Sequence, residues 1–152
     1  MKLLERIQKY IIKSEDKLKI SSKDIKKNDI FIALKGSNSH GNKYMHEAIR
    51  AGAKYCITDK KLSKCSSEQN ILLVENIQKF LLDLSKIKRS LYKGNVIGIT
   101  GSAGKTSLKE YLKYFLSKKF KVSASIKSYN NNLGVMVSIL NLNLKSDYSI
   151  FI

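Results

Sequence analysis

Apolar residues in the first half of the chain switch between helical and extended spacing. A helical stripe covers residues 3–12, where apolar side chains recur on one face. Short apolar runs predict four strands, at residues 18–20, 29–34, 53–57 and 71–74. Strands separated by helical and polar segments are typical of a small α/β unit.

The segment after the strand at 29–34 carries the clearest turn signals. It passes through Lys35-Gly36 into a polar loop over residues 37–42 that holds a second glycine, Gly41. A helix follows, and its apolar positions repeat at i, i+3 and i+4 at Met45, Ala48 and Ile49. Gly52 stands where it would end this helix in a left-handed conformation.

The second half has a stricter alternation of helix and strand. An amphipathic helix runs from Ile77 to Leu91 and is closed by Gly94. Strands are predicted at residues 95–100, 121–125 and 148–152. The two helices between them have predicted buried stripes at Leu108, Leu112, Phe115 and Leu116, and at Leu133, Val137 and Leu140. This order predicts a parallel sheet with right-handed crossovers. We place the domain boundary at Gly94, which gives domains at 1–93 and 94–152.

A glycine-rich turn joins the strand at 95–100 to the following helix. It consists of Gly101, Ser102, Ala103, Gly104, Lys105, Thr106 and Ser107. Backbone N–H groups of such a turn, at a helix N-terminus, attract phosphate oxygens. Lys105 would reach the β- and γ-phosphates, and the Thr106 hydroxyl would coordinate Mg²⁺. We therefore predict a loop that binds ATP and Mg²⁺.

The alternative is an ordinary strand-to-helix turn rich in small residues. The strict phosphate-loop pattern is not met, because its first glycine would fall at Ile99. A buried-type strand before the turn and an amphipathic helix after it nevertheless favour phosphate binding, since Gly-Lys-Thr at a helix start has little use in packing.

Charge does not favour a nucleic-acid partner, although the formal net charge is +17. Of the 29 basic residues only Arg6, Arg50 and Arg89 are arginine, and lysines are spread over nearly every segment. Hydrophobic content of 43% is typical of a soluble globular protein. No apolar run approaches the roughly 20 residues of a membrane helix. We expect a cytoplasmic monomer that binds neither nucleic acid nor a membrane.

Cysteine and histidine positions do not predict a metal site. Cys56 falls in a predicted strand and Cys65 in a polar connection, without metal-binding spacing. His40 and His46 stand isolated in the sequence, which is typical of solvated or helix-surface histidines.

Segments in both halves of the chain resemble the Mur ligases of peptidoglycan synthesis. Residues 99–110 (Ile-Thr-Gly-Ser-Ala-Gly-Lys-Thr-Ser-Leu-Lys-Glu) and 129–135 (Tyr-Asn-Asn-Asn-Leu-Gly-Val) resemble the ATP-binding part of the family. Residues 21–36 resemble its uridine-nucleotide domain, and Gly41 and the stretch 48–53 continue the match. The pair Lys109-Glu110 and the run Asn130-Asn131-Asn132 resemble those of members that add D-alanyl-D-alanine to UDP-N-acetylmuramoyl-tripeptide. The resemblance covers nearly the whole chain.

The resemblance implies an ATP-driven amide ligase. The carboxylate of the UDP-linked peptide would take the γ-phosphoryl group, and the amine of D-alanyl-D-alanine would then displace phosphate from the acyl phosphate. Lys105, Asn130 and Asn131 would be the catalytic residues, and Ser22 with Lys23 would contact the uridine nucleotide. The alternative for the asparagines is a polar turn with Asn132 as helix N-cap, and for Ser22 a turn without a ligand.

Three departures from the family pattern concern the substrate side. Ser21-Ser22-Lys23 replaces the usual Asp-Ser-Arg, Lys27-Asn28 replaces a Pro-Gly turn, and Met136 replaces a proline. Lys23 lacks the planar fork of arginine, so the nucleotide contact would differ in detail.

The chain stops just before the position at which the resemblance places a metal-binding glutamate. We therefore expect that these 152 residues alone have no ligase activity and are marginally stable. Other readings are a ligase of the family that adds a diamino acid, a phosphate-loop kinase or NTPase, and a non-catalytic UDP-sugar-binding module.

Overall fold

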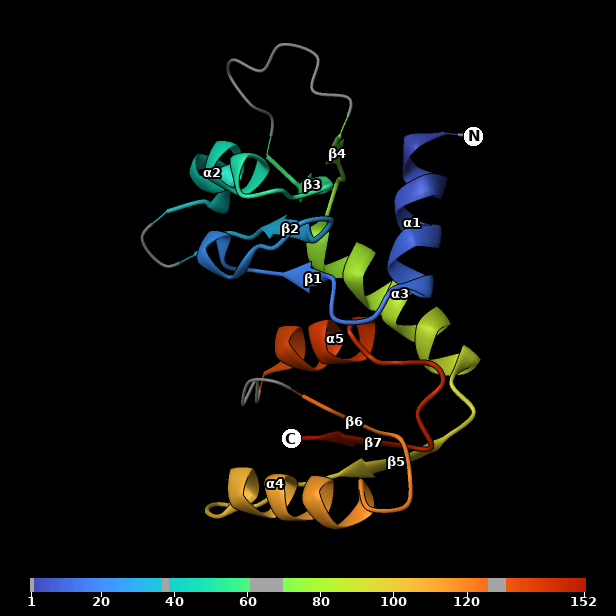
Figure 1. The fold of residues 1–152 in the computed structure, drawn as a ribbon. Coiled ribbons are helices and arrows are strands. Elements are labelled where there is room, and N and C mark those ends of the chain that lie inside the picture. The colour runs from blue at the N-terminus through green and yellow to red at the C-terminus, as the bar shows by residue number, and fades with distance from the viewer. Residues whose placement is uncertain (1, 37–38, 61–69, 126–130) are drawn as a thin grey trace. The chain divides into compact units, whose positions relative to one another are not determined.

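The chain folds into two compact units, each built around a parallel sheet (Figure 1). The computed structural model describes residues 2–36, 39–60, 70–125 and 131–152. One unit comprises Met1–Ile11 with Lys17–Phe80, and the other comprises Ile12–Asp16 with Leu81–Ile152. The α/β class predicted from the sequence is confirmed. Among the described residues, no helix has the length and apolar character needed to cross a bilayer.

The first unit has a four-stranded sheet in the order β1-β2-β3-β4, with all neighbours parallel. Its strands are β1 (Leu18–Lys19), β2 (Ile30–Ala33), β3 (Tyr55–Thr58) and β4 (Ile71–Leu73). Its helices are α1 (Leu3–Lys13), α2 (Met45–Arg50) and the short 3₁₀ turns η1 (Ser22–Asp24) and η2 (Gly41–Tyr44); α3 (Ile77–Leu91) begins in this unit. Each of these strands and α-helices lies where apolar spacing predicted one, whereas the two 3₁₀ turns were not predicted.

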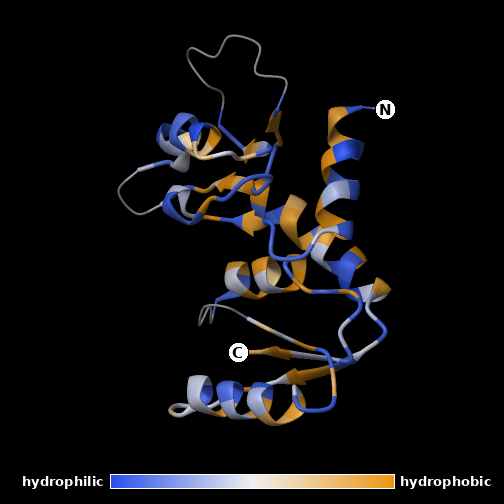
Figure 2. Cartoon of the chain, viewed as in Figure 1, coloured by the Kyte–Doolittle hydropathy of each residue, from blue (hydrophilic) through white to orange (hydrophobic). Residues whose placement is uncertain are grey.

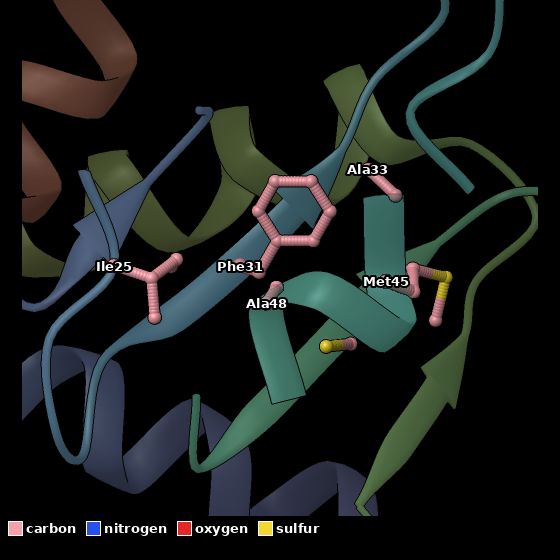
Figure 3. Close-up of a cluster of buried hydrophobic side chains, with 6 residues drawn as sticks. Ile25, Phe31, Ala33, Met45 and Ala48 are labelled. Atoms are coloured by element: carbon pink, nitrogen blue, oxygen red, sulfur yellow. The ribbon is translucent and has the colours of Figure 1, made fainter. Parts of the chain in front are cut away.

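The core between α2 and the sheet is formed by apolar side chains of mixed size (Figure 3). Its buried members are Ile25, Phe31, Ala33, Met45, Ala48 and Cys56. Gly52 has a φ of +103°, which confirms the predicted left-handed end of the α2 segment. The whole of β2 and β3 is buried.

The turn before β2 is held by a buried carboxylate. Asp29 is 1% exposed, and its Oδ2 accepts a hydrogen bond from the Lys26 N–H at 2.9 Å. Its Oδ1 lies 3.2 Å from Lys17 Nζ. Asn28, one residue earlier, has a φ of +69°, a left-handed conformation that asparagine tolerates better than most residues. The glycine that the resemblance implies at this position would adopt the same conformation without steric cost.

The second unit has a three-stranded sheet in the order β5-β7-β6, again parallel throughout. Its elements are β5 (Asn95–Gly98), α4 (Lys105–Leu116), β6 (Val122–Ala124), α5 (Asn132–Leu140) and β7 (Tyr148–Phe151). Helices α4 and α5 lie on opposite faces of this sheet (Figure 1). Gly98 pairs with Phe151, and Ala124 pairs with Ile150, so the carboxyl ends of β5 and β6 meet at one edge.

The predicted buried stripe of α4 is partly wrong. Leu108 is 47% exposed and Phe115 is 61% exposed, whereas Leu112 and Leu116 are half-buried. Helix α4 lies against β6 and β7, and β5 is an edge strand whose Val96 is 39% exposed. The spacing of apolar residues predicts which face of a helix is apolar, but that face is buried only where another element covers it. The described part of this sheet is too narrow to cover Leu108 and Phe115.

Apolar residues are concentrated in the strands of both sheets, and the helices alternate between apolar and polar residues (Figure 2). In the second unit Ser149 and Ile150 of the central strand β7 are fully buried. This central strand fixes the positions of the loops that follow its two neighbours.

Candidate functional site

The glycine-rich turn lies between β5 and α4, as predicted. Helix α4 begins at Lys105, and its N-cap is Gly104, whose φ is +75°. Gly101 also has a positive φ, at +148°. Left-handed backbone at these two glycines turns the chain tightly enough for several N–H groups to face one concave side at the helix N-terminus. Residues 101–104 are exposed, so phosphate oxygens have access to these groups.

Lys105 lies folded over its own loop. Its ammonium donates hydrogen bonds to the carbonyl oxygens of Gly101 and Ser102, the latter at 3.4 Å. Phosphate oxygens carry formal negative charge and are stronger acceptors for an ammonium than backbone carbonyls. A polyphosphate in this loop would therefore draw Lys105 away from Gly101. Thr106 and Ser107 are exposed in the first turn of α4, beside the loop.

Asn131 is the N-cap of α5, not Asn132 as predicted for the alternative without a site. Its Oδ1 accepts a hydrogen bond from the Gly134 N–H at 2.7 Å. The capping bond directs the side-chain oxygen into the helix end, and consequently turns the amide nitrogen to the other side of the carboxamide. Asn132 is instead the first residue of the helix. Asn130 lies outside the described residues.

Parallel pairing brings the start of the glycine-rich loop and Ser125, which follows β6, to the same edge of the sheet. The Ile99 N–H donates to the Phe151 carbonyl at 2.9 Å, and the Ser125 N–H donates to the Ile150 carbonyl at 3.1 Å. Both bonds extend the ladder by one residue beyond the carboxyl ends of β5 and β6. Crevices outside the carboxyl ends of parallel strands are the usual ligand sites in open α/β sheets.

A separate cavity of about 560 Å³ lies in the first unit. Its lining includes Ser21, Ser22, Lys23, Lys35, Gly36 and Tyr44. The structure thus places both residues predicted for the uridine nucleotide, Ser22 and Lys23, at one cavity. Lys23 and Lys35 are exposed at it, and Tyr44 is 42% exposed. Two ammonium groups and an aromatic ring suit a ligand that combines phosphate with a flat base.

The loop at this cavity is held close to β2. The Gly41 N–H donates to the Leu34 carbonyl at 2.7 Å, and the Gly36 N–H donates to the Ser39 carbonyl at 2.9 Å. A Cβ on Gly41 would lie 2.9 Å from the Ala33 Cα atom. Only glycine permits this approach, which explains in packing terms why Gly41 belongs to the motif.

His40 is not isolated, contrary to the prediction from its sequence position. Its Nε2 lies 3.0 Å from Asp59 Oδ1, and its Nδ1 accepts a hydrogen bond from the Asn42 N–H at 3.2 Å. Thr58, which is buried at the end of β3, donates to the Asn42 side-chain oxygen. The contacts of His40 with Asp59 and of Asn42 with Thr58 join residues 19 and 16 positions apart, separations that sequence spacing does not reveal. They fix the cavity loop to the end of β3.

Sequence reasoning missed several residues of the cavity. Lys35, Tyr44 and Glu47 line it but were not predicted. They could have been predicted from their positions in the sequence. All three follow the carboxyl end of the strand at 29–34, and ligands usually bind beyond the carboxyl ends of parallel strands. Among the described residues, no three His, Cys, Asp or Glu side chains cluster as a metal site would require, and Cys65 lies outside those residues.

Two family models match the chain. The model described as Mur ligase family, catalytic domain, matches residues 16–124, and the model described as Mur ligase middle domain matches residues 99–151. The second match includes the glycine-rich loop and Asn131.

Curated relatives include ligases of two kinds. The chain is 39% identical over 136 residues to the UDP-N-acetylmuramoyl-tripeptide–D-alanyl-D-alanine ligase of Rickettsia prowazekii (strain Madrid E), covering 90% of this chain and 30% of the relative. It is 34% identical over 124 residues to the UDP-N-acetylmuramoyl-L-alanyl-D-glutamate–2,6-diaminopimelate ligase of Rickettsia felis (strain ATCC VR-1525 / URRWXCal2), covering 82% of this chain and 23% of the relative. The chain therefore spans less than a third of either relative.

Solved structures show the same fold. The MurF ligase from Thermotoga maritima in complex with ADP superposes with a TM-score of 0.68 at 30% identity, covering 93% of this chain and 32% of that one. MurF from Acinetobacter baumannii superposes with a TM-score of 0.71 at 27% identity, covering 88% and 29%.

Proposed function

Because this chain belongs to the Mur ligase family, we propose that it provides the UDP-substrate and ATP-binding parts of a peptidoglycan-precursor ligase. The proposed reaction adds D-alanyl-D-alanine to UDP-N-acetylmuramoyl-tripeptide with consumption of ATP. The observation that carries this proposal is the loop of residues 101–107 at the start of α4, which follows β5 at the sheet edge where the carboxyl end of β6 also lies. The relative from Rickettsia prowazekii, named for this reaction, supports it.

In the proposed ATP site, the loop N–H groups and the helix N-terminus hold the phosphates. Lys105, released from the Gly101 carbonyl, neutralises charge between the β- and γ-phosphates. The Thr106 hydroxyl, in the first turn of α4, fits the position of a Mg²⁺ ligand. Mg²⁺ would supply further charge neutralisation as the γ-phosphoryl group passes to the substrate carboxylate.

Asn131 has a positioning and electrostatic part in this proposal. Its oxygen caps α5, so its amide N–H groups are directed away from the helix and suit oxyanions of the γ-phosphate or of the substrate carboxylate. An amide donates to these oxygens without adding charge. Asn130, adjacent in sequence, is proposed for the same role.

For the uridine nucleotide we propose the cavity of the first unit. Ser22 would donate or accept a hydrogen bond, and Lys23 would pair with phosphate as a point charge in place of the arginine fork typical of the family. Lys35 adds a second ammonium at the same cavity. This assigns the substrate nucleotide to residues 1–93 and ATP to residues 94–152.

The main alternative is a ligase that adds a diamino acid, because the Rickettsia felis relative is named for that reaction and is 34% identical. The Lys109-Glu110 pair and the asparagine run before Leu133-Gly134 favour the D-alanyl-D-alanine reaction. A phosphate-loop kinase or NTPase, and a UDP-sugar-binding module, are alternatives from other classes. The predicted cytoplasmic location and monomeric state stay predictions.

Separate calorimetric titrations test the proposal. We expect binding of Mg-ATP and, independently, of UDP-N-acetylmuramoyl-tripeptide, with a preference for the tripeptide over the L-alanyl-D-glutamate form. Lys105→Met should abolish the first and leave the second unchanged, whereas the exposed control Lys119→Met should alter neither.

Each alternative has its own outcome in the same titrations. A kinase would ignore the UDP compound, a sugar-binding module would ignore ATP, and a diamino-acid ligase would prefer the L-alanyl-D-glutamate form. Any of these three results would overturn the proposal.

A further inference from the structure

His40 has no part in the function proposed above, although both of its sequence neighbours do. Ser39 and Gly41 line the cavity proposed for the uridine nucleotide. The His40 side chain is 13% exposed and lies against Asp59. Both of its ring nitrogens have partners, and each partner restricts the protonation state that the ring can adopt.

The contacts of His40 fix the place of its proton. Nδ1 lies 3.2 Å from the backbone nitrogen of Asn42, and a backbone N–H can only donate. Nδ1 therefore accepts this bond and carries no proton. The proton of the neutral ring is then on Nε2, which donates to Asp59 Oδ1 at 3.0 Å. The arrangement thus requires neutral His40.

The bond to Asn42 makes His40 the N-cap of η2. Residues typical of this position are serine, threonine, aspartate and asparagine, whose side-chain oxygens accept the bond throughout the neutral pH range. A histidine accepts it only while the ring is neutral. The turn η2 includes Gly41 and Tyr44, which both line the cavity. The cap of a cavity-lining turn is therefore a group that titrates.

Protonation of His40 would add a hydrogen to Nδ1, because Nε2 already carries one. The new N–H would face the Asn42 N–H, and two donors form no hydrogen bond. The bond from Nε2 to Asp59 persists in both states and gains a charge when the ring is protonated. A proton on His40 thus breaks the cap of η2 and leaves the link to Asp59. The titratable groups on the segments around His40 are Lys35, Lys43, Tyr44, His46, Glu47, Asp59 and Lys60.

We propose that His40 is a positioning residue of the nucleotide cavity, which in its neutral form caps η2 and so holds Gly41 and Tyr44 in the cavity lining. This inference rests on the proposed assignment of the uridine nucleotide to that cavity. Asn42 connects the capped turn to the end of β3, because its side-chain oxygen accepts a hydrogen bond from the Thr58 hydroxyl. Loss of the cap loosens the turn, so the affinity for the UDP-linked substrate falls as the pH falls.

Two substitutions of His40 separate its two bonds. His40→Asn places an amide oxygen near the position of Nδ1, so it keeps the cap, does not titrate and gives up the bond to Asp59. His40→Gln places its amide nitrogen near the position of Nε2, so it keeps a donor for Asp59 and gives up the cap. His46→Gln is the matched control, because His46 is an exposed histidine on α2.

The measurement is the dissociation constant of UDP-N-acetylmuramoyl-tripeptide, determined by calorimetry between about pH 5.5 and 8, the range in which histidine side chains titrate. Both phosphates of this ligand are esterified and gain no proton in that range. Any titration of the ligand or of Glu47 is common to all variants. Unfolding temperatures are recorded in parallel, so that affinities are compared only where each variant is folded.

We expect the wild type and His46→Gln to bind about fivefold more weakly at the acid end of the range, the effect of one lost N-cap. His40→Asn should bind within about twofold of the wild type at the alkaline end and keep that affinity as the pH falls. His40→Gln should bind about fivefold more weakly at every pH. Should His40→Gln fail to fold, the pH profiles of the wild type and His40→Asn decide the question.

Equal pH profiles of the wild type and His40→Asn would overturn the inference, as would wild-type affinity of His40→Gln or loss of binding by His40→Asn at the alkaline end. In each case binding of the UDP compound by the wild type would leave the proposed function standing. A wild-type chain that does not bind this compound at any pH overturns the proposed nucleotide assignment, and the inference with it.

Discussion

Lys88 Nζ lies 2.6 Å from the carbonyl oxygen of Leu140, the last residue of α5. The same ammonium donates to the Ser14 carbonyl at 2.6 Å, and the residue is fully buried on α3. Burial lowers the pKa of Lys88 from 10.5 to about 8, an effect that the nearby Glu15 carboxylate partly opposes. Lys88 thus links α3 to the Ser14 segment and to the C-terminus of α5, where the helix dipole favours a positive charge.

This lowered pKa predicts an unusual pH dependence of stability. Below pH 8 Lys88 is protonated in both the folded and the unfolded chain. Between about pH 8 and 10.5 the unfolded chain keeps the proton that the folded chain has released, so the free energy of unfolding rises with pH. The contribution is at most about 3 kcal/mol.

Urea unfolding between pH 7 and 10.5 measures the effect. The wild type should gain stability relative to Lys88→Met as the pH rises, whereas Lys86→Met, an exposed lysine on the same helix, should follow the wild type. A pH-independent difference between the wild type and Lys88→Met would contradict the prediction.

Gly41→Ala should destabilise the first unit by about 1–3 kcal/mol, because the added Cβ would lie 2.9 Å from both Ala33 Cα and the Leu34 nitrogen. Affinity for the UDP-linked substrate should fall as well, since Gly41 lines the cavity. Gly98→Ala is the control, because a Cβ there meets no atom within 4 Å. Thermal unfolding and calorimetric titration give the two readouts, and equal behaviour of the two variants would refute the packing argument.

Asn28→Gly should keep or slightly raise stability, by up to about 1 kcal/mol, because glycine adopts the left-handed φ of +69° at no steric cost. Asn28→Val should lower it by about 1–2 kcal/mol, since a β-branched side chain is strained in that conformation. Both are measured by urea unfolding. A stable Asn28→Val variant would show that the turn adopts another conformation in solution.

Thr106→Val should remove the dependence of ATP binding on Mg²⁺, since valine keeps the shape of threonine and lacks its hydroxyl. Thr106→Ser should retain that dependence. Titrations of ATP with Mg²⁺ and with EDTA compare the two variants. If Thr106→Val still binds ATP more tightly with Mg²⁺ than with EDTA, Thr106 is not the metal ligand.

Much of the local structure followed from short-range patterns. The strand at 29–34, the left-handed glycine after α2 and the glycine-rich loop before α4 were predictable because each depends on a few neighbouring residues. The stripe at Leu108 and Phe115 was not, since its exposure depends on the width of the sheet that α4 covers. Likewise the place of Asn131 as N-cap was missed by one residue, because adjacent asparagines have equal capping preference.

The sequence by itself determined the α/β class, the glycine-rich loop before α4 and the family, because these depend on local spacing and on motifs. Only the tertiary structure decided which lysines are structural. Lys88 and Lys109 look like the other lysines in the sequence, yet they are buried against carbonyl oxygens 52 and 16 residues away. A lysine's burial and its hydrogen-bond partners are set by chain segments brought together in folding, and no periodicity around the residue records them.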